Sequence, residues 1–305
     1  MTEGYHAPVM LREVLRYLSP ERGGLYFDGT LGGGGHSEGI LRKGPAARVI
    51  GVDRDDEAVA AARARLTPYG LRAALVHGDY ASAAESLREP LAGALLDLGV
   101  SSHQIDEERR GFSFRRGAPL DMRMSPEAGG RTAADLLNEL PEAELADVFF
   151  RYGEERRSRR LAAEVVKRRA SRAFATADDL VAALHGALGA RGAQDKARVF
   201  QAVRIAVNGE LEQLERALPV LRDRLSVDGV FVVISYHSLE DRRVKASFRE
   251  WSRSCVCPPG LPVCACRGRS LGEELTRKVV RPSAEEVESN VRARSARLRA
   301  WRKAA

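Results

Sequence analysis

Four short apolar segments in the first hundred residues each end at, or just before, an aspartate. They are residues 25–27, 48–52, 74–76 and 93–96, followed by Asp28, Asp53, Asp79 and Asp97. Residues 37–41 and 55–66 lie between the first three segments and are expected to be helical. Strands that alternate with helices need crossover connections, which produce a mostly parallel sheet. The fold is therefore expected to be α/β.

Strand character nearly disappears after residue 104. The following hundred residues contain helical stretches, two of which begin with capping-box patterns, Thr132 with Asp135 and Thr176 with Asp179. One long helix is expected at about residues 198–218, where apolar side chains recur every three or four positions, and residues 229–235 form an apolar strand. We therefore expect a discontinuous domain, residues 1–104 and 201–305, with a helical insert domain at 105–200.

A glycine-rich loop, residues 28–37, follows the first expected strand. Glycine lets a backbone turn sharply and approach a ligand with no Cβ atom in the way. The loop lacks the Gly-Lys-Ser/Thr of a P-loop, and no register supplies the G-x-G-x-x-G of a dinucleotide-binding fold. It suits S-adenosyl-L-methionine, which has no pyrophosphate to hold, although a plain tight turn would use the same glycines.

The aspartates at the strand ends strengthen the prediction of a binding site. Ligands of parallel sheets bind outside the carboxyl ends of the strands. Asp53 is placed to accept hydrogen bonds from ribose hydroxyls, and Asp79 with Tyr80 to flank an adenine. Each aspartate alone could equally be a turn residue or a helix N-cap. Four of them at equivalent positions favour a shared crevice.

Positive charge is concentrated in two segments of a chain whose formal net charge is +7. Residues 151–172 and residues 277–305 each hold nine basic and three acidic residues, so the remainder is net negative. Arginine-rich segments favour a polyanion such as nucleic acid, whereas solvated helix faces are the simpler alternative. No uncharged run approaches the ~18 residues of a membrane span, which excludes a membrane-inserted protein.

The four cysteines lie within one short stretch, at Cys255, Cys257, Cys264 and Cys266. A secreted disulfide scaffold would spread its cysteines through a shorter chain, so a cytoplasmic protein is expected. Four neighbouring thiols could bind structural zinc, although C-x-x-C is the more usual spacing and unmetallated thiols are the alternative. Arg253, Arg267 and Arg269 nearby suit a loop that faces RNA.

Eight motifs occur along the chain in one order. They are HAPV (6–9), DGTLGGGGHS (28–37), DLGVSS (97–102), RGFSF (110–114), LDMRM (120–124), YGEER (152–156), FQAVRIAVN (200–208) and HSLEDR (237–242). An arginine-rich tail follows. The set strongly resembles the bacterial 16S ribosomal RNA cytosine-N4 methyltransferases, the RsmH or MraW family. The resemblance implies a Rossmann-like, S-adenosyl-L-methionine-dependent methyltransferase domain with an inserted helical domain that recognises substrate.

The resemblance also implies site residues and partners. The cofactor would be held by Gly34, Gly35, His36, Asp53, Tyr80, Asp97 and Gln104. The substrate would be a decoding-centre cytidine of 16S rRNA in the small ribosomal subunit. Two positions depart from the family pattern, since His103 stands where proline is expected and Tyr236 where phenylalanine is common. The oligomeric state is left open, with a homodimer as one option.

Methylation of the cytosine N4 amine needs alignment and acceptors that localise its lone pair. The turn from Asp97 to Ser102, with Ser101, is the candidate source of these acceptors by analogy with other exocyclic-amine methyltransferases. Residues Ser235, Tyr236 and His237 leave a second strand end, and Tyr236 could stack on a flipped base.

Structural roles and other functions compete with this interpretation. Ser238 with Asp241 could form a capping box, leaving His237 structural, and His36 could cap the helix after the glycine loop. A nicotinamide dehydrogenase would need the absent G-x-G-x-x-G. A ribosome-assembly or DNA-binding factor with a vestigial cofactor pocket is the rival from another class.

Overall fold

The computed structural model describes residues 8–189, 192–258, 263 and 265–305. The chain forms two compact units, here called the helical unit (Val100–Leu211) and the sheet unit (His6–Gly99 with Glu212–Ala305). The helical unit begins five residues before the expected insert, 105–200, and ends eleven residues after it. No helix among the described residues is both long and apolar enough to cross a bilayer.

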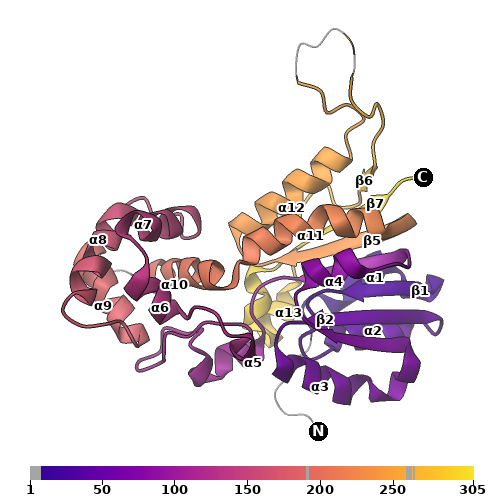
Figure 1. Ribbon diagram of the computed structural model, residues 1–305. Coiled ribbons are helices and arrows are strands. Elements are labelled where there is room, and N and C mark those ends of the chain that lie inside the picture. Colours follow the sequence, from indigo (N-terminus) through magenta and orange to yellow (C-terminus); the bar gives the residue numbers. More distant parts are fainter. Residues whose placement is uncertain (1–7, 190–191, 259–262, 264) are drawn as a thin grey trace. The chain divides into compact units, whose positions relative to one another are not determined.

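The sheet unit contains a seven-stranded sheet of order β3-β2-β1-β4-β5-β7-β6 (Figure 1). The strands are β1 (Gly24–Asp28), β2 (Ala47–Asp53), β3 (Ala73–His77), β4 (Leu91–Asp97), β5 (Leu225–Ser235), β6 (Gly272–Glu274) and β7 (Arg297–Lys303). β1 to β5 pair in parallel, and β7 runs antiparallel to both β5 and β6. The strand order reverses between β1 and β4, which is the point where doubly wound sheets bind ligands. The predicted α/β, Rossmann-like fold is confirmed.

Helices cover both faces of the sheet. They are α1 (Leu11–Leu18), α2 (Gly35–Lys43), α3 (Asp56–Leu66), α4 (Tyr80–Ser86), α11 (Glu210–Arg224) and α12 (Ser238–Trp251); the sheet unit also contains the short helix α13 (Ala284–Ser289). Side chains alternate between the faces: Leu25 and Phe27 join the core shared with α4, α11 and α12, whereas Tyr26 joins the core shared with α1, α2 and α3. Because both faces are buried there, β1, β4 and the second half of β5 are nearly continuous apolar runs.

The helical unit begins with the short helix α5 (Ser102–Asp106) and holds α6 (Ala133–Glu139), α7 (Glu142–Arg151), α8 (Ser158–Arg169), α9 (Ala177–Leu188) and α10 (Ala193–Asn208) around one apolar core. Both predicted capping boxes are present, with Thr132 beginning α6 and Thr176 beginning α9. Short 3-10 segments complete the described chain at Pro20–Arg22, Thr67–Arg72, Glu108–Arg110, Pro126–Ala128 and Val291–Ser295.

The single helix expected at residues 198–218 is wrong: two helices, α10 and α11, occupy this stretch. Gly209 separates them with a left-handed backbone (φ 60°), and its N–H donates to the Ile205 carbonyl. This is a glycine helix stop, which an apolar repeat alone does not reveal. Arg204 donates twice to Glu210, at 2.8 Å each, across the break.

Candidate active site

The glycine loop is tied to the ends of β1 and β2 by two carboxylates. Asp28, fully buried at the end of β1, accepts a hydrogen bond from the Ser37 hydroxyl at 2.7 Å. Asp53, at the end of β2, accepts from the N–H groups of Gly32 (2.8 Å) and Asp55 (3.0 Å). Burial raises the pKa of each carboxyl to about 6, against the opposing effect of these hydrogen bonds. These hydrogen bonds therefore hold the backbone of the glycine loop in one conformation.

Two glycines of the loop are held close to neighbouring elements. Gly34 precedes α2 with φ 79°, and a Cβ atom there would lie 3.2 Å from that of Ala62. A Cβ on Gly35 would lie 3.1 Å from the Pro8 ring. Both positions therefore favour glycine for packing as well as for any ligand, and Gly34 also for its positive φ.

His36, Asp97 and Tyr236, predicted from three separate segments of the sequence, lie together at the ends of β4 and β5. The Tyr236 hydroxyl donates to Asp97 Oδ1 at 2.9 Å, and His36 Nδ1 lies 3.8 Å from Asp97 Oδ2. His36 Nε2 is 2.9 Å from the Val9 carbonyl, which can only accept, so Nε2 carries a proton. His36 is the second residue of α2 and not its cap.

Burial dominates the electrostatics of this cluster. It raises the pKa of Asp97 to about 6, although His36 and the Tyr236 hydroxyl act in the opposite direction. Burial, with the neighbouring Asp97, also places the pKa of Tyr236 well above its usual range. The cluster thus presents a carboxylate that can take up a proton near neutral pH.

The Tyr236 ring lies against Gly99, two residues beyond β4. A Cβ on Gly99 would be 3.3 Å from Tyr236 Cδ2, and the backbone there has φ 99°. Glycine is thus required for the close approach of the turn to the ring.

Other predicted residues have structural contacts. Asp79 caps α4 by accepting from the Ser82 N–H at 2.9 Å, and Tyr80 begins that helix. The Ser235 hydroxyl donates to the Arg297 carbonyl in β7 at 3.4 Å. In the helical unit, Ser101 and Gln104 form the capping box that begins α5.

The capping box expected at Ser238 and Asp241 is wrong by one residue. His237 is the N-cap of α12, and Glu240, only 2% exposed, accepts from the N–H groups of Tyr236 (2.9 Å) and His237 (3.3 Å). Asp241 instead binds Arg299, with 2.6 Å between Oδ1 and Nε. Glu240 was missed in the sequence analysis, although the His237-x-x-Glu240 spacing could have indicated this capping box.

Much of the basic tail binds its own chain. Arg299 is buried against Asp241, Arg302 pairs with Glu273, and Lys303 Nζ donates to the Leu225 carbonyl at 2.6 Å. These residues belong to β7 and bond within the chain, so they do not form a free surface for binding a polyanion. The exposed basic residues of the tail are Arg277, Lys278, Arg281 and Arg294.

The other basic segment is divided in the same way. Arg168 pairs with Glu164 at 2.6 Å, and Arg169 donates to the carbonyls of Leu137 and Leu140. Arg156, Arg159, Arg160 and Lys167 are exposed on and just before α8. They are here called the α8 basic face.

Comparison with known proteins gives one family. The profile of the MraW methylase family matches residues 3–304. Relatives named "Ribosomal RNA small subunit methyltransferase H" include one from Gemmatimonas aurantiaca, 54% identical over 99% of this chain and 96% of that protein. Others are from Syntrophobacter fumaroxidans (50%; 98% and 96% covered) and Geotalea uraniireducens (49%; 99% and 100% covered).

Proposed function

The chain belongs to the MraW methylase family, and we propose that it transfers the methyl group of S-adenosyl-L-methionine to the exocyclic N4 amine of a decoding-centre cytidine in 16S ribosomal RNA. The single observation that carries the chemistry is the cluster of Asp97, Tyr236 and His36 beside the β1–β4 reversal. Small-subunit rRNA as the substrate class is taken from the names of the relatives. Because the proposed substrate is the small ribosomal subunit, the proposed location of the activity is the cytoplasm.

The residues at the strand ends fit the proposed cofactor. Its ribose hydroxyls are donors, and Asp53 is a carboxylate with acceptor capacity beyond the two N–H groups it already binds. Its sulfonium and ammonium groups are cationic, and Asp28, Asp53 and Asp97 are carboxylates whose charge is disfavoured by burial. A cation would offset that cost. Gly34, Gly35, His36 and Tyr80 would line the same pocket, and the cofactor contact of Gln104 stays a prediction from the motif resemblance.

When bound, S-adenosyl-L-methionine supplies an electrophilic methyl group, so no covalent enzyme intermediate is needed. Asp97 accepts a hydrogen bond from the cytosine amine, which concentrates the nitrogen lone pair, and takes up the proton that the alkylated amine loses. Tyr236 holds Asp97 through its hydroxyl, and its ring offers a face on which the flipped cytosine stacks. Ser101, Ser235 and His237 act as positioning residues through their caps and strand contacts.

RNA binding is assigned to exposed arginine and lysine side chains. One group is the α8 basic face in the helical unit. The other is the exposed basic residues of the tail, which lie outside β7. Each phosphate contact releases counterions, so affinity should fall steeply with salt.

Methyl transfer to small ribosomal subunits that lack the modification tests this function. Tritiated S-adenosyl-L-methionine should label N4 of one cytidine, identified by nucleoside analysis, and calorimetry should detect cofactor binding. Label on a ring carbon or on ribose would contradict the assignment. Binding of RNA without any binding of cofactor would favour the assembly-factor alternative.

A further inference from the structure

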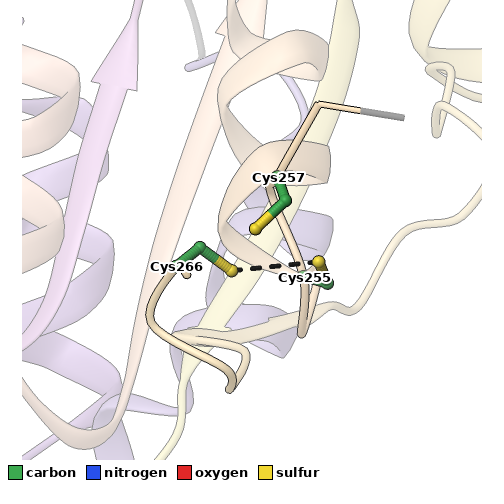
Figure 2. A group of neighbouring side chains, drawn as sticks. All are labelled: Cys255, Cys257 and Cys266. Atoms are coloured by element: carbon green, nitrogen blue, oxygen red, sulfur yellow. Dashed lines mark hydrogen bonds between the residues drawn. The ribbon is translucent and has the colours of Figure 1, made fainter. Parts of the chain in front are cut away.

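Three cysteines gather in the segment between α12 and β6. The Sγ atoms of Cys255, Cys257 and Cys266 all lie within 4.8 Å of one another, and those of Cys255 and Cys266 are 3.9 Å apart (Figure 2). All three are free thiols. Cys264, expected from the sequence to join them, lies outside the described residues.

Contacts other than those of the thiols hold the two arms of this segment together. The Arg267 guanidinium donates to Glu250 Oε1 in α12 at 2.7 Å and to the Arg253 carbonyl at 3.2 Å. Its Nε donates to the Arg269 carbonyl at 2.9 Å. Because Arg267 follows Cys266 directly, these bonds place that cysteine beside the arm that carries Cys255 and Cys257.

The 3.9 Å between the sulfurs of Cys255 and Cys266 matches tetrahedral thiolate coordination, and the Cys257 sulfur lies within 4.8 Å of both. With Zn–S bonds of about 2.3 Å, tetrahedral geometry separates neighbouring sulfurs by about 3.8 Å. The Val256 N–H also donates to Cys266 Sγ at 3.3 Å, the type of backbone contact that stabilises a metal-bound thiolate. We propose that Cys255, Cys257 and Cys266 bind a structural Zn²⁺ ion.

Zinc binding would displace the three thiol protons to solvent and close the segment that returns from α12 to β6. The exposed Arg253 and Arg269 flank the cluster. The ion would thus hold these two cations in one arrangement. This proposal does not depend on the proposed methyl transfer, because its tests measure metal and not activity.

Metal analysis of full-length protein purified without a His-tag, under reducing conditions, tests the site. We expect about one zinc per chain, released when a mercurial titrates the thiols. Cys266→Ser should lose the zinc, whereas Ser254→Ala, an exposed neighbour in the same segment, should keep it. Tryptophan fluorescence of both variants verifies that the sheet unit is folded, since Trp251 and Trp301 are buried in its core.

Cobalt substitution provides a test that needs no variant. Wild-type protein stripped of metal should bind Co²⁺ with tetrahedral d–d bands and a sulfur-to-cobalt charge-transfer band, both displaced by Zn²⁺. Zinc-free protein with freely titrating thiols and no cobalt spectrum would overturn the proposal. So would a Cys255–Cys266 disulfide in protein alkylated directly from cells, or retention of zinc by Cys266→Ser.

Discussion

Replacing Asp97 with asparagine should stabilise the sheet unit above about pH 6 while it abolishes methyl transfer. The side chain is only 20% exposed, and burial raises its pKa from 3.8 to about 6. The folded protein therefore binds this proton more tightly than the unfolded chain does. The contribution of Asp97 to stability is complete below pH 3.8 and is lost as the pH rises through 6.

The magnitude follows from the two pKa values. Ionisation of Asp97 should lower the free energy of unfolding by about 3 kcal/mol between pH 3 and pH 8, with about half of the loss reached by pH 5. This is an upper value, because a fifth of the side chain remains exposed. Asparagine does not ionise, and its Oδ1 can still accept from the Tyr236 hydroxyl. The variant should therefore gain stability relative to wild type as the pH rises.

Urea unfolding of both proteins without cofactor, from pH 4 to pH 8, measures the difference. Tryptophan emission reports the sheet unit alone, since the chain's two tryptophans, Trp251 and Trp301, are buried there. Asp53 is present in both proteins, so its titration cancels in the comparison, whereas the repulsion between Asp28 and Asp97 is part of the measured difference. A stability difference that does not change with pH, or that falls as pH rises, would refute the reasoning.

Three further changes test other parts of the structure. Tyr236→Phe removes the hydroxyl that favours the charged form of Asp97, so the acidic limb of the kcat/KM profile should move to higher pH; an unmoved limb would show that Asp97 does not set it. Arg299→Met leaves Asp241 largely buried beside Arg297, 3.7 Å away, and should cost about 3–5 kcal/mol in urea unfolding; a cost below about 1 kcal/mol would mean that the pair is dispensable. Arg160→Glu with Lys167→Glu should weaken RNA binding and reduce its salt slope by about 2, with the Tm unchanged. Arg63→Glu, an exposed site on α3, is the control, and an equal loss there would indicate a nonspecific charge effect.

Local sequence patterns predicted the first four strands, both capping boxes of the insert and the family. The profile match to residues 3–304 confirms the resemblance drawn from the motifs. These features depend on side-chain periodicity, glycine conformation and caps, all of which act within a few residues. The same reasoning missed Gly209 as a helix stop, since the apolar repeat continues on both sides of it.

The basic tail illustrates a limit of charge counting. Arg299 reads as one more cation among nine, yet it is 5% exposed and binds Asp241, 58 residues earlier in the chain. A side chain's burial depends on which strand lies beside it, so no count of charges distinguishes a β7 arginine from an exposed one.

The sequence by itself determined the α/β class, the glycine loop and the positions of the strand-end aspartates, because short-range backbone preferences encode them. Only the tertiary structure decided what those aspartates contact. Asp28 and Asp53 hold the loop, Asp79 caps a helix, and Asp97 meets a tyrosine 139 residues away. That last contact exists because β5 pairs beside β4, and strand order is a property of the whole sheet.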